Sequence, residues 1–524
     1  MIKKITLYFY TIRYLKPIQI FYQVFYIFLN SISRKPLDLS KRQNLKFTHL
    51  KYTISLENRS YGGDNKFKFL NISHQFENGI DWELMVYGKL WQYNLAYFDF
   101  LNNSKLSKED GLLLINNFID SQNLLKSCNE PYPISLRLIN WIRYVNLHQI
   151  NNSRIIDAIY NQSNRLLHRL EYHLLGNHLL ENGFCLLHVA KFFFNKYLYQ
   201  TAKNLLFKQL DEQILPDGGH FELSPMYHQT IFYRVLESID LLKSNYEESD
   251  KNLLEFLESK AEHMLSWLNN ITFQNGDIPL LNDSSNGIAP TSTQLRYFAQ
   301  KLNIVSSNTI LKESGYRKFQ NKNYEAIFDV GSVGPSYQPG HAHADMLNLI
   351  VYQEQKPFII ETGTSTYQNN ARRHLERSTE SHNTVVVDNQ NQSQVWSGFR
   401  VAKRAKLKIL EDKENKIIAQ QNGFGNVQHL RQVDFLENKI EITDEIIGNP
   451  KNTIAHLHFV PNLSLEVSNN TILFEGGKII FNNADIVSLE DYYYAPKFNV
   501  LVPSKKLKIL FKKELITQII FDTE

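Results

Sequence analysis

Histidine and carboxylate side chains gather in three segments of the second half of the chain. His341 and His343 are separated by one residue, and Glu361 and His382 follow in segments rich in Gly, Thr and Ser. If residues 341–343 form a strand, the two histidines project to one face, because side chains two positions apart on a strand point the same way. Two histidines and a carboxylate form an open zinc-type ligand set, with a vacant position for water or substrate. The alternative is polar residues on a solvated sheet face, or satisfied core histidines, but the clustering favours a site.

Two polar segments interrupt apolar sequence in the first half of the chain. One contains Asn177 and His178, and the other contains Glu222 and Tyr227. Asn177 and His178 can donate hydrogen bonds to a substrate carboxylate. Tyr227 can exchange a proton if neighbouring cations or a metal lower its pKa. Each also has a structural interpretation, namely a helix cap or buried amide for Asn177 and an ordinary core aromatic for Tyr227.

The elements that position these residues change in type along the chain. From about Trp82 to Asn303 the apolar residues recur at helical spacing, and short segments with Pro, Gly and Asn separate the runs, which predicts repeated helical hairpins. After about Leu311, short alternating runs separated by turn residues predict β-strands. Helices do not alternate with these strands, so a parallel architecture such as a TIM barrel is disfavoured.

Composition excludes several classes of protein. The chain has 524 residues, 43% of them hydrophobic, which predicts more than one domain and a large core. With 57 Lys and Arg against 53 Asp and Glu the net charge is +4, too small an excess to indicate a nucleic-acid partner. The two cysteines, Cys128 and Cys185, are too few for a disulfide framework and too far apart for a CxxC metal site.

The N-terminus is basic and then uncharged. The uncharged run over residues 17–33 is at the lower limit for a membrane span, and polar residues such as Gln19 and Gln23 interrupt it. No small-residue cleavage site follows, so we do not predict a signal peptide. One interpretation is a basic aromatic helix lying on a partner or making peripheral membrane contact through residues 1–35. The other, which the pattern slightly favours, is a helix packed on its own domain.

The order of motifs between His341 and Arg404 resembles the heparinase II/III-like family, relatives of alginate lyases. The chain shows, in the family's order, His-Ala-His-Ala-Asp, Glu-Thr-Gly-Thr-Ser-Thr-Tyr, Ser-His-Asn-Thr-Val-Val-Val-Asp and Trp-Ser-Gly-Phe-Arg. The resemblance covers roughly residues 82–404. It implies a multidomain α+β protein, with an N-terminal (α/α) toroid of helical hairpins and a C-terminal antiparallel β-sandwich. We accordingly expect a basic, aromatic helical arm at residues 1–75, the toroid at 76–305 and the sandwich at 310–524.

The resemblance also implies roles for individual residues. In similar lyases two histidines and an acid bind a divalent metal, expected to be Zn²⁺, which implies His343, Glu361 and His382 as ligands. The family's acid is usually Asp, so Glu361 departs from the pattern by one methylene and can retune the choice of metal. The catalytic residues implied are Tyr227 for proton transfer, Asn177 and His178 for binding the carboxylate, and a substrate-facing His341. The expected substrate-binding residues are Arg373, Arg377, Glu222 and Tyr367.

These roles fit β-elimination on a polysaccharide that contains uronic acid. The proton next to the carboxylate is barely acidic, and hydrogen bonds from Asn177 and His178 would stabilise the enolate-like charge that develops when it leaves. Tyr227 or His341 would take the proton, and a tyrosine can also return one to the leaving oxygen. Arginines between Glu361 and His382 can bind further carboxylates as bidentate forks, although a solvated charged loop is an equally good interpretation for most of them. The expected partner is an anionic polysaccharide or oligosaccharide.

Other interpretations of the sequence remain. The His-x-His pair also occurs in metal-dependent hydrolases, but those usually have a parallel barrel with the pair near its first strand. A non-catalytic or hydrolytic protein of a surface-polysaccharide biosynthesis pathway is a further alternative, because fold alone does not establish activity. Asp283 would line the cleft or cap a helix, and aromatic residues such as Tyr93 and Tyr97 fit a helical core better than a sugar-stacking surface. The resemblance implies the periplasm or cell envelope and a role in capsule or exopolysaccharide metabolism, whereas the lack of a clear signal peptide favours the cytoplasm or the inner membrane face.

Overall fold

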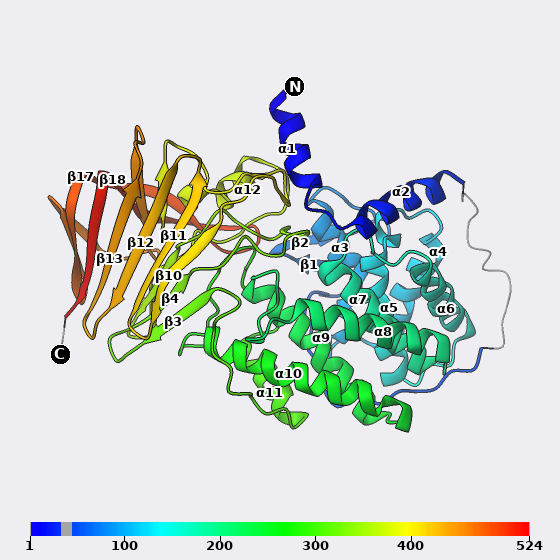
Figure 1. Ribbon diagram of the computed structural model, residues 1–524. Helices are drawn as coiled ribbons and strands as arrows, with labels where there is room; N and C mark the ends of the chain where they lie inside the picture. Colours follow the sequence, from blue (N-terminus) through cyan, green and yellow to red (C-terminus); the bar gives the residue numbers. More distant parts are fainter. Residues whose placement is uncertain (1, 33–44, 523–524) are drawn as a thin grey trace.

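The chain folds into a helical part and a β part that lie side by side (Figure 1). The computed structural model describes residues 2–32 and 45–522. Helices occupy the chain up to Lys301, and strands dominate from Tyr316 to the C-terminal end, which confirms the predicted α+β fold class.

Two helices and a hairpin precede the main helical part. Helices α1 (Ile2–Ile12) and α2 (Pro17–Ile32) are separated by a short turn, and Pro17 opens the second helix. Within the described residues no helix is both long enough and apolar enough to span a bilayer. Residues 45–75 of the expected helical arm are not helical, unlike α1 and α2. They contain the hairpin β1 (Lys66–Phe69) and β2 (Ile72–Gln75), and their buried apolar side chains join the core of the helical domain: Leu50, Ile54, Phe67 and Phe69.

The helical domain is built around α7 (Gly176–Phe192), whose residues are almost all buried. A helix buried on nearly all sides must be covered all round, and α7 is covered by α5 (Pro131–Leu147), α8 (Lys196–Gln213) and α9 (Pro225–Ser244). The remaining helices of the domain are α3 (Lys89–Tyr97), α4 (Lys108–Ser121), α6 (Ser153–Leu167), α10 (Lys251–Ile271) and α11 (Ser292–Lys301).

Two antiparallel sheets form the β part and share one apolar core. The smaller sheet has the order β3-β4-β5-β6, and its strands are β3 (Tyr316–Gln320), β4 (Tyr324–Asp329), β5 (Leu349–Gln353) and β6 (Lys356–Ile359). The larger sheet has the order β10-β11-β12-β13-β18-β17-β16-β15, and β14 joins β18 to β7. Its strands are β7 (Val385–Val387), β10 (Leu407–Lys413), β11 (Lys416–Phe424), β12 (Val427–Phe435), β13 (Lys439–Ile447), β14 (Thr453–His458), β15 (Leu465–Ser468), β16 (Thr471–Phe474), β17 (Gly477–Lys497) and β18 (Val500–Phe521). The short hairpin β8 (Val395–Trp396) and β9 (Arg400–Val401) and the helix α12 (Ala371–Glu376) belong to the connecting segments.

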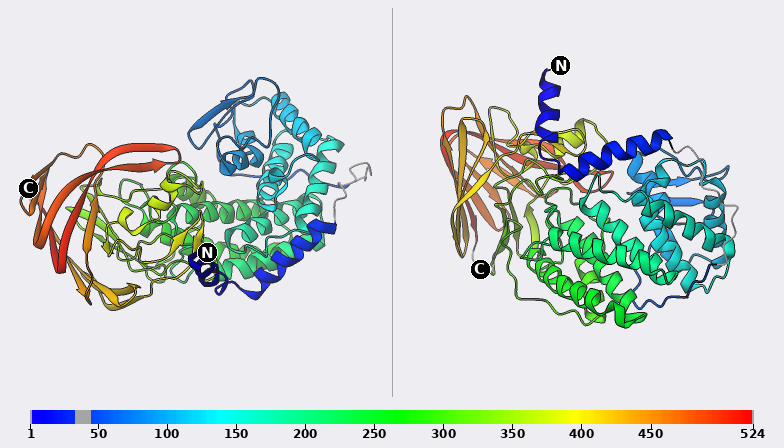
Figure 2. Two further views of the ribbon diagram at one scale, coloured as in Figure 1. Left: turned by 90° about the horizontal axis from the view of Figure 1, so that it is seen from above. Right: turned by 45° about the vertical axis from the view of Figure 1, so that its right-hand side comes forward.

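A separate apolar cluster joins the two parts. Trp267 and Ile271 of α10 pack with Ile327 of β4 and Ile350 of β5, and all four side chains are buried. Figure 2 shows the connecting segments of the β part reaching over the end of the helical domain. The loops that carry the sequence motifs therefore lie at the junction of the two parts.

Candidate active site between the helical domain and the sandwich

A cavity of about 600 Å³ lies at this junction. Helices α3, α5, α7 and α9 line one side of it, and loops of the β part line the other. Its walls are rich in aromatic side chains, and ring faces of this kind suit sugar rings. The aromatic lining residues are Tyr87, Tyr93, Tyr97, Tyr132, Tyr227, Tyr233, Tyr367, Phe399 and Phe498.

Asn177 and His178 reach the cavity from the first turn of α7. Leu175 and Gly176 both have positive φ values (62° and 57°), which turns the chain sharply before the helix begins. A Cβ on Gly176 would lie 2.8 Å from Glu222 Oε1, so a side chain there would displace this carboxylate. Asn177 Nδ2 donates to Glu222 Oε2 at 2.8 Å. Glu222 is buried behind Asn177 and is not among the lining residues, so it orients the amide.

His178 is held by a carboxylate of its own. Its Nδ1 lies 3.0 Å from Glu171 Oε1, and its ring packs 4.6 Å from that of Tyr132. Burial alone would lower the pKa of His178, but the Glu171 carboxylate outweighs this effect and raises it above the ordinary value. The part-exposed imidazole therefore favours a positive charge at the cavity wall.

Tyr227 enters the cavity from the first turn of α9. Ser224 caps this helix by accepting a hydrogen bond from the Tyr227 backbone at 3.3 Å, and Pro225 occupies the first helical position. The Tyr227 ring stacks on the His341 ring with centroids 3.8 Å apart, and its hydroxyl lies 3.3 Å from the hydroxyl of Tyr367. Tyr227, His341 and Tyr367 thus place three groups that can carry a proton next to one another.

Proton abstraction by Tyr227 would need a lowered pKa, whereas the environment of this residue raises its pKa. Burial raises this pKa well above the ordinary value, and Tyr367 and the carboxylates of Asp283 and Glu222 raise it further. In this environment the Tyr227 hydroxyl keeps its proton at neutral pH, which suits a proton donor.

His341 is oriented by a fully buried carboxylate. Its Nδ1 lies 2.9 Å from Asp283 Oδ2, and Asp283 also accepts two hydrogen bonds from Arg373, one of them at 2.7 Å. Although burial would raise the pKa of Asp283, Arg373 and the histidines hold it well below the usual range. Because an ionised carboxylate only accepts hydrogen bonds, His341 Nδ1 must donate, which leaves its Nε2 as a proton acceptor when the ring is neutral.

His343 contacts the other oxygen of the Asp283 carboxylate. Its Nε2 lies 2.9 Å from Asp283 Oδ1. The expectation that residues 341–343 form a strand is wrong, because both histidines lie in the loop between β4 and β5. Pro339 and Gly340 open this segment and interrupt the alternating pattern. The two rings therefore converge through a shared carboxylate and not through a sheet face.

The two predicted arginines bind the protein itself. Arg373, in α12, is fully buried against Asp283 and donates to the Gly398 carbonyl at 3.0 Å. Arg377 donates to the carbonyls of Ala342 at 2.9 Å and Gly398 at 3.2 Å. Neither arginine lines the cavity. The expectation that they bind substrate as forks is not supported, because their donors fix the loops around His341.

The three predicted metal ligands lie close together and are buried. The rings of His343 and His382 have centroids 5.3 Å apart, and His382 Nδ1 lies 2.5 Å from Glu361 Oε2. The other oxygen of Glu361 accepts a hydrogen bond from Asn348. Among the described residues no three His, Cys, Asp or Glu side chains are arranged as a metal site.

Unpartnered polar atoms in this cluster nevertheless fit the chemistry of a divalent metal. His343 Nδ1, His382 Nε2 and Asp345 Oδ2 are buried and have no hydrogen-bond partner within the described part of the chain. Burial lowers the pKa of His343 to about 3, so its ring is neutral and Nδ1 carries a free electron pair. Asp345 was not among the predicted ligands, yet its carboxylate has the unpartnered oxygen, whereas both oxygens of Glu361 have protein partners.

Two hairpin tips meet at the edge of the cavity. Asn71, in the turn of β1–β2, donates to the Phe498 carbonyl at 2.9 Å. Asn499, in the turn of β17–β18, donates to the Leu70 carbonyl at 2.9 Å. Leu70, Phe498 and Asn499 all line the cavity, so this reciprocal pair of bonds connects the two parts of the protein across its rim.

Some residues of the site were not predicted from the sequence. Asp283 neither lines the cleft nor caps a helix, but its carboxylate binds both histidines and Arg373. Tyr93 and Tyr97 line the cavity although helical periodicity favoured the core. Tyr97 is also buried, so both interpretations describe it in part. For Asp283 the only signal was the polar Asn-Asp-Ser triplet directly after an apolar run.

Comparisons with known proteins agree with this architecture. The family profile described as "Heparinase II/III N-terminus" matches residues 134–312, and "Heparinase II/III-like, C-terminal" matches residues 307–521. A heparin-sulfate lyase of Bacteroides stercoris is 25% identical over 338 residues, which are 58% of this chain and 49% of that protein. A heparin-sulfate lyase of Bacteroides thetaiotaomicron is 24% identical over 300 residues, 48% of this chain and 41% of that protein. The chain thus spans about half the length of the curated relatives it matches.

Solved structures share the fold. A heparinase III structure superposes with a TM-score of 0.67 at 16% identity, covering 97% of this chain and 92% of that one. The heparan sulfate lyase of Pedobacter heparinus superposes with a TM-score of 0.54 at 17% identity, covering 88% and 82%. The likeness to these structures concerns the fold, in which a helical domain precedes an antiparallel β part. The chain belongs to the heparinase II/III-like family.

Proposed function

We propose that the protein is a polysaccharide lyase that cleaves a polymer containing uronic acid by β-elimination. The observation that carries the proposal is the stack of Tyr227 on His341 beside Asn177 and His178, all four of which line one cavity. The similarity to proteins named heparin-sulfate lyases supports the same reaction class. The reaction breaks the bond between C4 and the glycosidic oxygen, removes the proton from C5 and leaves a C4–C5 double bond.

His341 is the base in this proposal. Its Nδ1 is committed to Asp283, so Nε2 is the atom that takes the proton from C5. The buried, ionised Asp283 also stabilises the imidazolium that forms. The ring of His341 is therefore oriented before the substrate arrives.

Tyr227 is the acid in this proposal. Its raised pKa keeps the hydroxyl protonated, so it can donate its proton to the leaving glycosidic oxygen. Because the Tyr227 and His341 rings stack at 3.8 Å, base and acid approach the sugar from one side. This arrangement suits a uronate whose C5 proton and C4 oxygen lie on the same face of the ring, as in glucuronate.

Asn177 and His178 hold the carboxylate of the reacting sugar. Asn177 donates from a rigid position next to the N-terminus of α7, and His178 adds a favoured positive charge. Donors placed where negative charge develops in the transition state contribute about 3 to 4 kcal/mol each. Their role is to neutralise the carboxylate, so that the C5 proton becomes acidic enough to be removed.

The charge of the cavity favours a substrate with little sulfate. Lys89 and Arg234 are the Lys and Arg side chains among the described lining residues, and both are paired. Lys89 lies 2.9 Å from Glu130, and Arg234 pairs with Glu181 at 3.1 Å and Glu237 at 2.6 Å. Densely sulfated chains need Arg or Lys side chains that are free to bind the sulfate groups. We therefore propose a carboxylated, sparsely sulfated polymer, of the kind found in capsules and exopolysaccharides.

A divalent metal would be held by His343 and His382 with Glu361 or Asp345. It would supply a fixed positive charge that ties the loops after β4 and β6 to the segment before β7. Because elimination consumes no water, the proposal requires no water-activating metal.

The experiment that tests the proposal follows the ultraviolet absorbance of the unsaturated uronate product. The panel contains heparosan, hyaluronan and alginate as unsulfated polymers and heparin as the sulfated one, and Tyr227→Phe is the matched control. We expect a signal with an unsulfated glucuronate polymer that the control lacks. A faster reaction with heparin would overturn the assignment of a sparsely sulfated substrate, and no signal with any polymer would overturn the lyase.

A further inference from the structure

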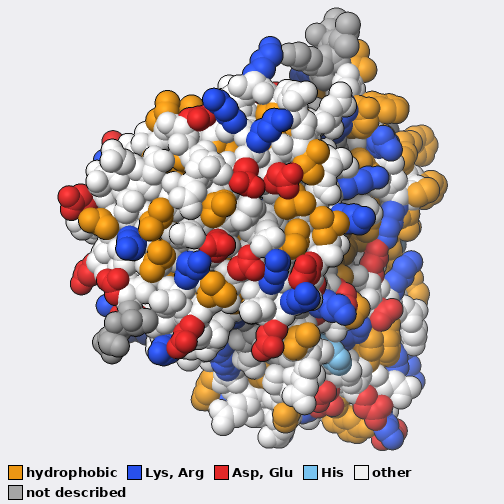
Figure 3. All heavy atoms as spheres, turned by 60° about the vertical axis from the view of Figure 1, so that its left-hand side comes forward, with side chains coloured by type: hydrophobic (Ala, Val, Ile, Leu, Met, Phe, Trp, Pro, Cys, Tyr) orange, Lys and Arg blue, Asp and Glu red, His pale blue; other side chains and the backbone are white. Residues whose placement is uncertain are grey.

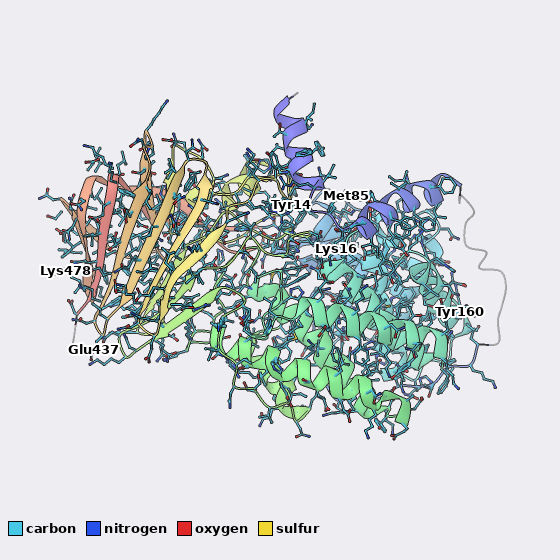
Figure 4. The ribbon with its side chains drawn as sticks, in the orientation of Figure 1. Tyr14, Lys16, Met85, Tyr160, Glu437 and Lys478 are labelled. Atoms are coloured by element: carbon cyan, nitrogen blue, oxygen red, sulfur yellow. The ribbon has the colours of Figure 1, made fainter. Side chains whose placement is uncertain are left out.

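The two N-terminal helices use their polar and tyrosine side chains to contact the rest of the protein. In α1, Thr11 Oγ1 accepts a hydrogen bond from Trp396 at 3.1 Å. In the turn that follows, the Tyr14 ring lies 3.9 Å from the Arg404 guanidinium. Lys16, in the turn after α1, pairs with Glu212. Figure 4 shows Tyr14 and Lys16 at the junction of α1 with α2.

The second helix is attached in the same way. Gln19 donates to the Leu174 carbonyl at 3.1 Å, and Tyr26 donates to the Leu170 carbonyl at 2.6 Å. Gln19 is almost completely buried, although it is an amide. The inward side of the pair thus combines polar contacts with the packing of Ile18 on the helical core and of Tyr22 on Tyr172.

The outward face is apolar, which reverses the usual distribution for a helix on a water-soluble surface. Aliphatic and phenyl side chains of both helices are between 39 and 63% exposed. Exposed apolar side chains that gather on helices in this way mark an interaction site. The side chains are Ile5, Phe9, Ile12, Ile20, Phe21, Val24, Phe25 and Ile27.

The charged side chains within residues 2–32 are all basic, and one of them, Lys16, pairs with Glu212 of the helical domain. Residues 2–32 contain Lys3, Lys4, Arg13 and Lys16 and no Asp or Glu. The neighbouring loop adds Arg400, whose guanidinium lies 5.3 Å from the Tyr8 ring, and Lys403, which lies 4.9 Å from the Tyr10 ring. By contrast, Figure 3 shows basic and acidic side chains intermingled over the side of the molecule that it presents.

We propose that α1 and α2 form a docking surface for an anionic lipid bilayer. Helices with an apolar face and flanking cations lie in the plane of the interface, where the apolar side chains enter the acyl boundary and the cations meet lipid phosphates. Seen from above in Figure 2, α1 and α2 lie along the edge of the molecule opposite the hairpin β1–β2, which borders the cavity. A bilayer on this edge would leave the cavity rim free.

A second copy of the chain fits this face less well. Symmetric dimers place the same patch of both copies against each other. Such a dimer would bring the cations of two α1 helices together with no carboxylate from either α1 or α2 to pair with them. Anionic lipid headgroups supply the missing negative charge.

The experiment is vesicle flotation of the full-length protein. One set of vesicles contains phosphatidylcholine with phosphatidylglycerol, and the other contains phosphatidylcholine alone. We expect binding to the anionic vesicles that weakens with salt and is at least several-fold lower for the neutral ones. Phe9→Asp with Phe21→Asp should reduce binding about tenfold or more, and Lys4→Glu with Arg13→Glu should reduce it by a similar factor.

The matched control is Leu113→Asp with Leu124→Asp, which changes two side chains that are 68 and 83% exposed on the helical domain. This variant should bind like the wild type, and circular dichroism checks that every variant is folded. Equal binding of wild type and Phe9→Asp/Phe21→Asp, or no binding of the folded wild type, would overturn the proposal. Concentration-dependent dimerisation that the same substitutions abolish, without vesicle binding, would assign the face to a second copy of the chain.

Discussion

The Asp283 carboxylate lies 2.9 Å from Nδ1 of His341 and joins the two halves of the protein at the site itself. Asp283 belongs to the segment between α10 and α11, whereas His341 belongs to the loop between β4 and β5. The orientation of the proposed base therefore depends on the docking of one domain against the other. Asp283 is therefore both a contact between the two domains and the residue that orients the proposed base.

We expect Asp283→Asn to impair both folding stability and turnover. The substitution leaves the buried Arg373 without its charged partner, which typically costs about 3 to 5 kcal/mol. It also leaves one acceptor oxygen in place of the two that serve His341, His343 and Arg373. Differential scanning calorimetry and kinetics measure the two effects. Adding Arg373→Met should restore much of the stability without restoring turnover. Full recovery of turnover in the double variant would show that Asp283 has no positioning role.

Tyr227→Phe is expected to lower kcat by about two to four orders of magnitude, because it removes the proton donor. KM should change little, since the ring still stacks on His341. The matched control is Tyr52→Phe, which removes a buried hydroxyl that has no hydrogen-bond partner in the described structure and does not line the cavity. A Tyr227→Phe enzyme with a normal kcat would refute the assignment of the acid.

Asn177→Ala should lower kcat by about two to three orders of magnitude, because one donor to the developing enolate is lost. Circular dichroism and the thermal midpoint check that Asn177→Ala keeps the wild-type fold. A normal kcat in the folded variant would contradict the role of Asn177 in binding the carboxylate.

The free energy of unfolding is expected to decrease as the pH falls from about 4 to about 2. Burial disfavours the charged form of Asp444, but Arg431 and His429 lower its pKa to about 2, and Arg234 and Arg143 lower the pKa of the buried Glu237 to about 2 in the same way. A carboxyl group whose pKa is lower in the folded state stabilises the protein above its unfolded pKa. That contribution, about 3 kcal/mol for each group, is lost as the pH falls through the folded pKa.

Urea unfolding at a series of pH values measures this dependence. Asp444→Asn should show a shallower decrease over the same range, starting from a lower stability. A wild-type free energy that stays constant between pH 4 and pH 2 would contradict the charge assignments for Asp444 and Glu237.

If the buried histidine cluster holds a metal, chelation should lower the thermal midpoint. The two ring nitrogens of His343 and His382 that have no hydrogen-bond partner would then lose the metal ion that they bind. Elemental analysis of the purified protein and of His382→Ala gives the metal content directly. Because elimination consumes no water, turnover of the protein that remains folded should persist. A selective loss of turnover without loss of stability would argue for a direct role in the chemistry.

Local sequence patterns predicted more of the fold than of the candidate active site. Helical spacing up to residue 303 and alternating runs after residue 311 identified the two parts, because each period reflects which face of an element is buried. The Ser-Pro pair before Tyr227 also marks a helix start. The arm was harder to predict, because residues 45–75 contribute apolar side chains to the helical core without forming helices.

The partners of the site residues could not be predicted from spacing. Asp283 binds His341 and Arg373, which lie 58 and 90 positions away in the chain, so no local pattern connects them. Arg373 and Arg377 have the same sequence signature whether they face solvent, substrate or the protein, and only packing shows that they hold loops. Whether Glu361 or Asp345 is the better candidate for a metal ligand likewise depends on which of their carboxylate oxygens already have hydrogen-bond partners.

In the proposed reaction the glycosidic bond is broken by elimination and not by hydrolysis, and the mass of the product distinguishes the two. The wild-type protein and Tyr227→Phe are incubated with a defined glucuronate-containing oligosaccharide, and the new non-reducing end is measured by mass spectrometry. We expect a fragment lighter by one water than the hydrolysis product, formed by the wild type only. A fragment that has gained water, with oxygen from labelled solvent, would contradict elimination.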